Sequence, residues 1–213
     1  AVTLPIESDS QNGHLLVHGE FTLVRAMGNS LPALAYRPDR GSLAISTSQG
    51  LVVLGVAENY PMLYEIPGIF PTALAYSNDG SKLFAGLENG WMVLNAADQY
   101  RPLSTDPREG VIKIVINPTG GWFAVLSLKT ATVYRLVDLE PITTIVTLDS
   151  SATFSDAEFS PDGVTLALAE SRDYIRRFKA PEWDEVDTLN VPGRINALAY
   201  RPQILPRIPV VFI

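Results

Sequence analysis

The sequence predicts an all-β fold made of repeating four-stranded units of about forty residues. A short pattern recurs five times: an apolar run, a final aromatic or aliphatic residue, and a turn rich in Pro, Asn, Asp and Gly. The final residues of the runs lie 40, 40, 43 and 41 positions apart: Tyr36, Tyr76, Ile116, Phe159 and Tyr200. No segment between them has the periodicity of an amphipathic helix. A regular period near forty, composed of strands and turns, indicates the blades of a β-propeller.

The second repeat shows why each unit is predicted to hold four strands, named a to d. Strand a is an apolar run that ends at a turn in which Gly80 supplies a positive φ. Strand b is short and apolar, which is typical of a strand buried between neighbouring blades. The pair Asn89-Gly90 is a strong hairpin signal and separates strand b from strand c. The expected strands are residues 72–76, 83–86, 91–94 and 100–104.

The same order along the whole chain predicts one β-propeller domain with partial blades at its ends. Residues 2–6, 14–18 and 21–25 match strands b, c and d of the first partial blade, while 195–200 and 208–213 match strands a and b of the last. The four complete blades are residues 31–70, 71–110, 111–151 and 152–193, and the partial blades are 1–30 and 194–213.

The two partial blades leave the closure of the ring open. A blade shared between the chain ends would give a five-bladed ring, but strand b is then supplied twice. A five-bladed ring and part of a larger propeller both remain possible interpretations. An unpaired apolar strand exposes a row of backbone donors and acceptors. We therefore expect one terminal strand either to pair with another chain or to mark where a longer propeller was cut.

Composition excludes several classes of function. The net charge of −7 disfavours nucleic acid as a partner, because such binding depends on Lys and Arg that neutralise phosphates. The lack of Cys excludes disulfides, thiolate metal sites and cysteine nucleophiles. No apolar run approaches the roughly 20 residues that span a membrane. Export and a cytoplasmic location fit the composition equally, so the location is unknown.

Few residues suggest catalysis or metal binding. His14 and His18 fall on one face of an expected strand, but without a third ligand we expect them to face solvent. No Gly-x-Ser-x-Gly elbow is present, and only these two His could act as a base. Paired carboxylates such as Asp184 and Glu185 are expected to form a solvated rim. The sequence therefore predicts no catalytic residue, no cofactor and no metal.

The segment Phe-Ser-Pro-Asp-Gly at 159–163, followed by Leu-Ala-Leu-Ala at 166–169, resembles the WD40 and YVTN-type propeller repeats. WD40 repeats end strand c in Trp-Asp and carry Gly-His before strand a. Here the positions that match Trp-Asp hold other residues: 54–55, 94–95, 136–137 and 178–179. The one Trp-Asp pair, at Trp183, comes five residues too late. The resemblance therefore implies blades held by apolar packing, as in YVTN-like and quinoprotein-like propellers.

The loops that join strands b to c and d to a are expected to gather on one face around the central channel. Their candidate contact residues are Glu88, Asn89, Arg108, Lys129, Arg172, Asp173 and Arg194. This set is mixed in charge and differs from blade to blade, which suits a protein or peptide partner better than a small molecule. Trp183 is a further candidate, expected to be exposed among Pro, Glu and Asp on an outer strand.

The function predicted from these features is that of a non-enzymatic scaffold that presents loops from a rigid disc to another protein. The alternative is a lactonase-like or quinoprotein-dehydrogenase-like propeller, either an enzyme or a subunit of one, that acts through its central channel. Such a protein needs carboxylates, His or Arg that converge at the channel mouth, and the sequence supplies few.

Overall fold

The structure is a computed structural model that describes residues 33–57, 59–171 and 173–200 in full. It also describes the backbone of four terminal strands: β1 (Ile6–Asp9), β2 (His14–Val17), β3 (Val24–Arg25) and β21 (Pro209–Phe212). All elements in these parts of the chain are β-strands, so the predicted all-β class is confirmed.

Sixteen of the strands form four antiparallel sheets of four, each a simple meander. The first blade contains β4 (Leu34–Tyr36), β5 (Ser42–Thr47), β6 (Gly50–Gly55) and β7 (Met62–Pro67). The second contains β8 (Ala73–Tyr76), β9 (Lys82–Leu87), β10 (Gly90–Asn95) and β11 (Arg101–Asp106). The third contains β12 (Val111–Ile116), β13 (Trp122–Ser127), β14 (Thr130–Arg135) and β15 (Pro141–Val146). The fourth contains β16 (Phe154–Phe159), β17 (Thr165–Glu170), β18 (Tyr174–Lys179) and β19 (Asp184–Asn190).

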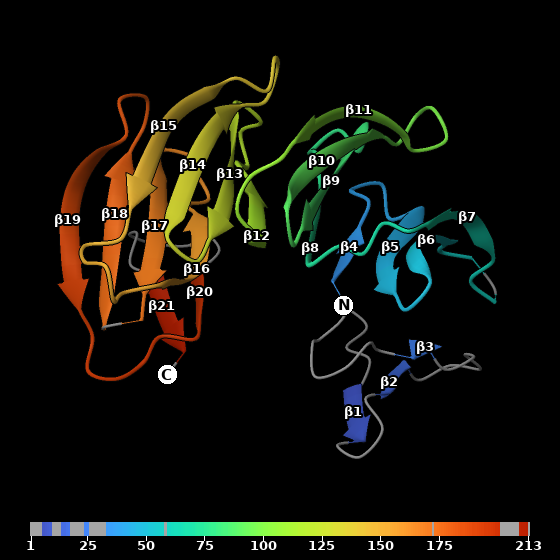
Figure 1. Cartoon of the computed structure of the whole chain (residues 1–213), viewed down its shortest axis with the longest axis horizontal. Coiled ribbons are helices and arrows are strands. Elements are labelled where there is room, and N and C mark those ends of the chain that lie inside the picture. The colour runs from blue at the N-terminus through green and yellow to red at the C-terminus, as the bar shows by residue number, and fades with distance from the viewer. Residues whose placement is uncertain are drawn as a thin grey trace.

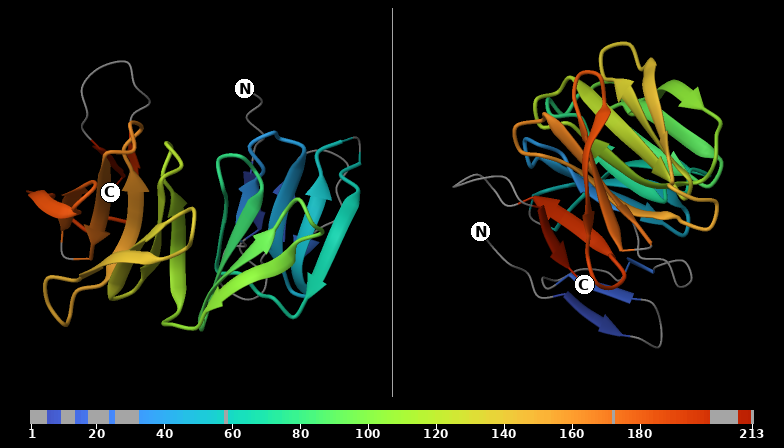
Figure 2. Two further views of the ribbon diagram at one scale, coloured as in Figure 1. Left: turned by 90° about the horizontal axis from the view of Figure 1, so that it is seen from above. Right: turned by 90° about the vertical axis from the view of Figure 1, so that its left-hand side faces the viewer.

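The blades follow one another around an arc in chain order (Figure 1). Their first strands contact each other in succession, β4 with β8, β8 with β12, and β12 with β16, which makes these the inner strands. Strand β20 (Ala197–Tyr200) continues the series beside β16 and pairs with β21. Figure 2 shows from two further sides that the sheets stand side by side. The molecule is a β-propeller with four blades and the first hairpin of a following unit.

The N-terminal strands form a separate three-stranded sheet in the order β1-β2-β3. Residues 2–5 of the expected first strand lie outside the described residues, and β1 begins at Ile6. At the other end, the expected strand at 208–213 is present as β21, paired with β20. Pairing of a terminal strand with another chain stays a prediction.

Apolar residues fill the gaps between the blades. The middle strands carry continuous apolar runs, such as Leu83, Phe84 and Ala85 on β9, because both of their faces are covered by neighbouring sheets. Four buried clusters result, and each lies between one blade and the next. The expected apolar packing between blades is therefore present.

Polar side chains also join consecutive blades at the turns between strands a and b. Asn117 Nδ2 donates to the carbonyl of Gly163 at 2.7 Å, and Arg37 Nε donates to the carbonyl of Gly80 at 3.0 Å. Asn78 Nδ2 reaches the carbonyl of Asn117 at 2.9 Å. Each donor lies just after the inner strand of one blade, and its acceptor lies in the turn of the next.

A buried ion network joins the third and fourth blades. Glu170 is fully buried, and its Oε1 accepts a hydrogen bond from Arg176 Nη1 at 2.9 Å. The same Nη1 donates to the carbonyl of Val146 on β15 at 2.8 Å, and Nη2 donates to Glu185 Oε2 at 2.8 Å. Glu170 Oε2 also accepts the backbone N–H of Leu148 at 3.2 Å, so hydrogen bonds reach both oxygens of a carboxylate that has no access to water.

Candidate functional site

The b–c turns and d–a connections lie together at one end of the blades, as the sequence predicts. The backbone N–H of Phe154 donates to the carbonyl of Leu128 at 2.8 Å, and that of Val191 donates to Asp173 at 2.7 Å. We call this end the loop face. It consists of the turns 48–49, 88–89, 128–129 and 171–173 and the connections 68–72, 107–110, 147–153 and 191–196, except Arg172, which lies outside the described residues.

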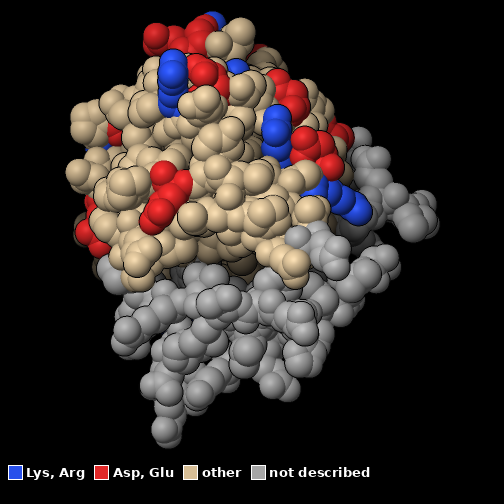
Figure 3. Space-filling model, turned by 90° about the vertical axis from the view of Figure 1, so that its right-hand side faces the viewer, with Lys and Arg blue, Asp and Glu red and all other residues tan. Residues whose placement is uncertain are grey.

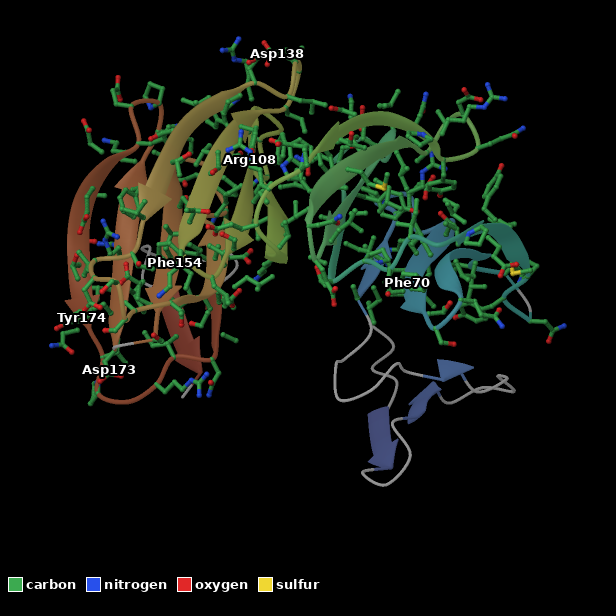
Figure 4. The ribbon with its side chains drawn as sticks, viewed as in Figure 1. Phe70, Arg108, Asp138, Phe154, Asp173 and Tyr174 are labelled. Atoms are coloured by element: carbon green, nitrogen blue, oxygen red, sulfur yellow. The ribbon has the colours of Figure 1, made fainter. Side chains whose placement is uncertain are left out.

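Four of the predicted contact residues are exposed on the loop face. Glu88 and Asn89 occupy the turn between β9 and β10, Arg108 follows β11, and Arg194 precedes β20. Asp173 is half-buried in the turn before β18, with a φ of 70°. Arg108 and Asp173 lie far apart across the molecule (Figure 4). The structure therefore spreads these residues around the face instead of bringing them to one point.

Lys129 binds the backbone of a neighbouring connection on the loop face. Its Nζ donates to the carbonyl oxygens of Ser150 at 2.8 Å and of Ala152. Both acceptors belong to the connection between the third and fourth blades. The lysine therefore fixes this connection against the turn between β13 and β14, and its charge is turned toward backbone carbonyls.

The expected exposure of Trp183 is wrong. Its side chain is only 4% exposed and packs edge-on against Trp122, with ring centroids 5.3 Å apart, and against Phe159 at 5.9 Å. The turn between β18 and β19 folds back, because the N–H of Trp183 donates to the carbonyl of Lys179 at 2.7 Å. This turn lies at the end opposite the loop face, so Trp183 offers no surface to a partner there.

A pocket of about 280 Å³ lies between the second and third blades, and its lining includes Arg108 and Glu109 of the loop face. Trp91 from β10 and Tyr134 from β14 line it and are almost fully buried. Arg108, Glu109 and Thr144 line it as well and are exposed, so they form its rim. We call this the interblade pocket. Of the predicted contact residues, only Arg108 lines it, and no sequence pattern points to the other lining residues.

The side chains in the walls of the interblade pocket contact one another. The Trp91 ring stands edge-on to Tyr134, with centroids 5.0 Å apart, and to Phe123 at 5.4 Å. Hydroxyl groups of the third blade line the pocket and bond to one another: Ser127 Oγ lies 2.7 Å from Thr130 Oγ1. The pocket therefore combines an aromatic wall with a row of hydroxyls.

Arg108 and Glu109 lie at the mouth of the interblade pocket, and Asp106 is bonded to Arg108 beside it. Arg108 Nε donates to Asp106 Oδ2 at 2.8 Å, and this bond raises the pKa of Arg108. The Tyr134 hydroxyl donates to the same carboxylate at 3.2 Å, and burial raises the pKa of Tyr134. Glu109 Oε2 accepts a hydrogen bond from Ser127 at 3.1 Å. With two carboxylates and one guanidinium, the mouth carries a net negative charge.

The inner strands offer a different set of charges. Lys113 Nζ on β12 lies 2.6 Å from Asp156 Oδ1 and 3.5 Å from Glu158 Oε2, both on β16. Asp156 Oδ2 also accepts the backbone N–H of Leu198 on β20 at 2.6 Å. Burial raises the pKa of Glu158, and the charge of Lys113 opposes that shift. These groups bind the third and fourth blades and β20 to one another.

The outer side of the first blade is largely uncharged (Figure 3). Met62, Leu63 and Tyr64 on β7 are exposed, as is Phe70 in the connection that follows.

In the parts of the chain that the structure describes, no group of three or more His, Cys, Asp or Glu side chains could hold a metal ion. Those parts also contain no helix long and apolar enough to cross a membrane.

Comparison with known proteins gives similarity in fold. No protein-family model and no curated protein matches the chain. Among solved structures, hydrazine synthase of Kuenenia stuttgartiensis is similar with a TM-score of 0.69 and 17% identity. The β-propeller domain of Cps50 (Swd1) from Myceliophteria thermophila is similar with a TM-score of 0.66 and 14% identity.

The matches cover most of this chain but a smaller share of the solved ones. They include 87% of this chain and 56% of the hydrazine synthase chain, and 81% of this chain and 59% of the Cps50 (Swd1) domain. The chain thus spans between half and two thirds of the length of the structures it matches. At this level of identity the likeness concerns the fold alone, and it agrees with the arc of blades: the chain is a β-propeller repeat protein.

Proposed function

We propose that this chain is a non-enzymatic scaffold that binds a partner protein or peptide through its loop face. The observation that carries the proposal is the interblade pocket, which is lined by Arg108 and Glu109 of the 107–110 connection and by Ser127 and Thr130 on either side of the 128–129 turn. It joins an almost fully buried aromatic wall to an exposed, charged rim. Recognition residues are often found on loops that a rigid scaffold positions.

The size of the pocket supports a side chain of a larger partner as its occupant. Its volume is about 280 Å³. Sites that enclose a drug-sized molecule typically measure roughly 300–1,000 Å³, so this pocket is slightly smaller than that range. The neighbouring exposed groups, Glu88, Asn89 and Arg108, differ in charge and in hydrogen-bonding type. A small pocket within a varied surface suits a peptide that anchors one residue and contacts the loops with others.

The loops around the pocket are bound to the blades, which favours binding. Lys129 holds the 147–153 connection through two carbonyls, and Ser127 bonds both to Glu109 and to Thr130. Ordering of loops on association costs free energy, so loops that are already ordered lower that cost. The same loops would present one fixed arrangement of groups to a partner.

The inner strands support an enzymatic role less well. Apart from tyrosines, the ionisable residues on the described inner strands are Lys113, Asp156 and Glu158, and they bind one another. Catalytic groups act best when they can reach a bound substrate and exchange a proton with it. The ion pairs instead direct these side chains toward adjacent strands.

The test is selection of a phage-displayed library of random peptides on the immobilised chain, followed by affinity measurement of the selected peptides. The decisive variant is Arg108→Met on the loop face, and its matched control is Arg101→Met. Both arginines are exposed: Arg101 is the first residue of β11, and Arg108 follows the strand. Each pairs with an aspartate, Arg101 with Asp98 at 3.7 Å and Arg108 with Asp106 at 2.8 Å. Arg101 lies at the opposite end of the strand.

We expect selected peptides to bind Arg108→Met about tenfold more weakly than the unmodified chain, the effect of losing one important contact residue. Their affinity for Arg101→Met should be unchanged. Failure to select any peptide that distinguishes these two variants would contradict binding through the loop face.

A further inference from the structure

We infer that the interblade pocket binds an uncharged amide group of the partner, either the side chain of Asn or Gln or an exposed backbone peptide unit. This inference rests on the proposed function and adds the chemistry of the group that enters the pocket. It follows from the charges at the rim, the bonds they already make and the nature of the walls.

The rim offers both hydrogen-bond donors and an acceptor. Arg108 uses its Nε to bond Asp106, and no acceptor for its two Nη groups occurs among the described residues. Glu109 receives Ser127 on Oε2, and its Oε1 has no donor among the side chains that the structure describes. A ligand at the rim can therefore accept from Arg108 and donate to Glu109. An amide does both at once, because its oxygen accepts and its nitrogen donates.

The charge balance at the rim disfavours a charged ligand. An anion would meet Arg108, but the two carboxylates of Asp106 and Glu109 outnumber that single positive charge. A cation would be drawn to Glu109 and would leave the Nη groups of Arg108 facing a like charge. Since desolvating a charged group is costly unless it is fully paired, an uncharged group with both hydrogen-bonding functions fits best.

The walls of the pocket suit a planar group with a short apolar stem. Trp91 supplies an aromatic surface, while Val111 and Val125 supply aliphatic ones. Tyr134 lines the pocket as well, but Phe123 stacks on its ring and the Arg108 guanidinium lies over it, 5.8 Å from the ring centroid. Thr132 Oγ1 and Thr144 Oγ1 already bond to each other at 3.1 Å, so these two hydroxyls do not require a hydrogen bond from the ligand. An amide can lie against an aromatic wall while its edge reaches the polar rim.

The test is titration of the full chain with small probes, followed by the indole N–H signals in ¹H–¹⁵N NMR spectra. Propionamide represents the side-chain amide, N-methylacetamide represents the backbone unit, and propionate and propylammonium are the charged counterparts. Trp91 lines the pocket and is almost fully buried, so its signal reports occupancy. Trp183 is the internal control, because it is also almost fully buried but lies in a different cluster.

We expect at least one of the two amides to shift the Trp91 signal saturably while the Trp183 signal stays in place. If propionamide binds more tightly, the occupant is a side chain, and if N-methylacetamide does, it is a peptide backbone. Arg108→Met should weaken the amide by about fivefold, the effect of one lost net hydrogen bond. Arg101→Met should leave it unchanged, and Glu109→Gln should improve binding of propionate relative to the amide.

Absence of a saturable Trp91 shift with both amides would overturn the inference, as would tighter binding of propionate or propylammonium. These outcomes can be separated from failure of the proposed function. Selected peptides that depend on Arg108, together with amides that do not bind, would contradict only the amide assignment. Amides that bind the pocket, in a chain for which no peptide depends on the loop face, would contradict the role in binding proteins.

Discussion

Replacement of Trp183 by Ala should destabilise the protein strongly. The side chain is 4% exposed and belongs to the apolar cluster between the third and fourth blades, in contact with the rings of Trp122 and Phe159. Removing a buried aromatic side chain costs about 3–5 kcal/mol, which includes the cavity that remains. Loss of the two edge-to-face contacts places Trp183→Ala toward the upper end of that range. The positive φ of 63° at this position adds little to the difference, because both residues bear the same strain.

Urea denaturation followed by circular dichroism measures this effect, and Val186→Ala on the exposed outer strand is its control. Val186 is 56% exposed, so its truncation should change the free energy of unfolding by less than about 0.5 kcal/mol. Leu166→Ala, which truncates a fully buried residue of the same cluster, should cost about 2–5 kcal/mol. If Trp183→Ala matched Val186→Ala instead of Leu166→Ala, the burial of Trp183 between the blades would be refuted.

Three further predictions concern the links within and between blades. Gly163→Ala should destabilise the chain by about 1–3 kcal/mol in urea denaturation, because the new Cβ would lie 2.4 Å from Asn117 Oδ1 and because the backbone at Gly163 has a φ of 70°. A variant with unchanged stability would contradict this close contact. Arg176→Met should lower the free energy of unfolding by about 3–5 kcal/mol, because it leaves the charge of Glu170 buried without its partner. Adding Glu170→Gln to Arg176→Met should recover part of this loss. A double variant no more stable than Arg176→Met would show that the unpaired Glu170 is not the cause. Hydrogen bonds from two serines lower the pKa of Asp79 to about 2, so its contribution to stability is present above its ordinary pKa near 3.8 and is lost as the pH falls toward 2. Asp79→Asn should therefore flatten the dependence of stability on pH in that window, and an unchanged acid dependence would argue against it.

The repeat made most of the fold predictable from the sequence. The inner and middle strands recur with apolar runs and Gly-containing turns, because every blade meets the same demands: both faces covered and a tight hairpin at each end. This periodicity places β9 at 82–87 and β17 at 165–170 around the expected runs. Local sequence alone carries these features.

The charged neighbours of Trp183 suggest an exposed side chain, but its place in the repeat decides its burial. The turn between strands c and d carries a residue with positive φ just before strand d in all four blades: Tyr60, Tyr100, Leu139 and Trp183. Tyr100 and Trp183 are both buried in clusters between blades. Aligning the repeats at this turn would have shown that a large side chain recurs there and covers the gap to the preceding blade.

The interblade pocket could not be predicted from the sequence, because it depends on how two blades pack. Its walls come from two blades, with Trp91 on one side and residues such as Val111 and Thr144 on the other. The sequence predicts strands within a blade but not how two neighbouring sheets are offset, and that offset decides which side chains face one another. Arg108 was identified from its loop, whereas Glu109 beside it was not.

Mapping a selected peptide onto the chain by NMR shows directly whether partners bind the loop face. The measurement is the change in backbone amide signals on titration with the tightest peptide from the selection. We expect the largest changes on the loop face, at residues 88–89, 107–110 and 128–130, and we expect the Trp91 indole signal to move with them. Changes confined to the opposite turns at 96–100 and 137–140, or to the apolar outer strand β7, would contradict binding through the loop face.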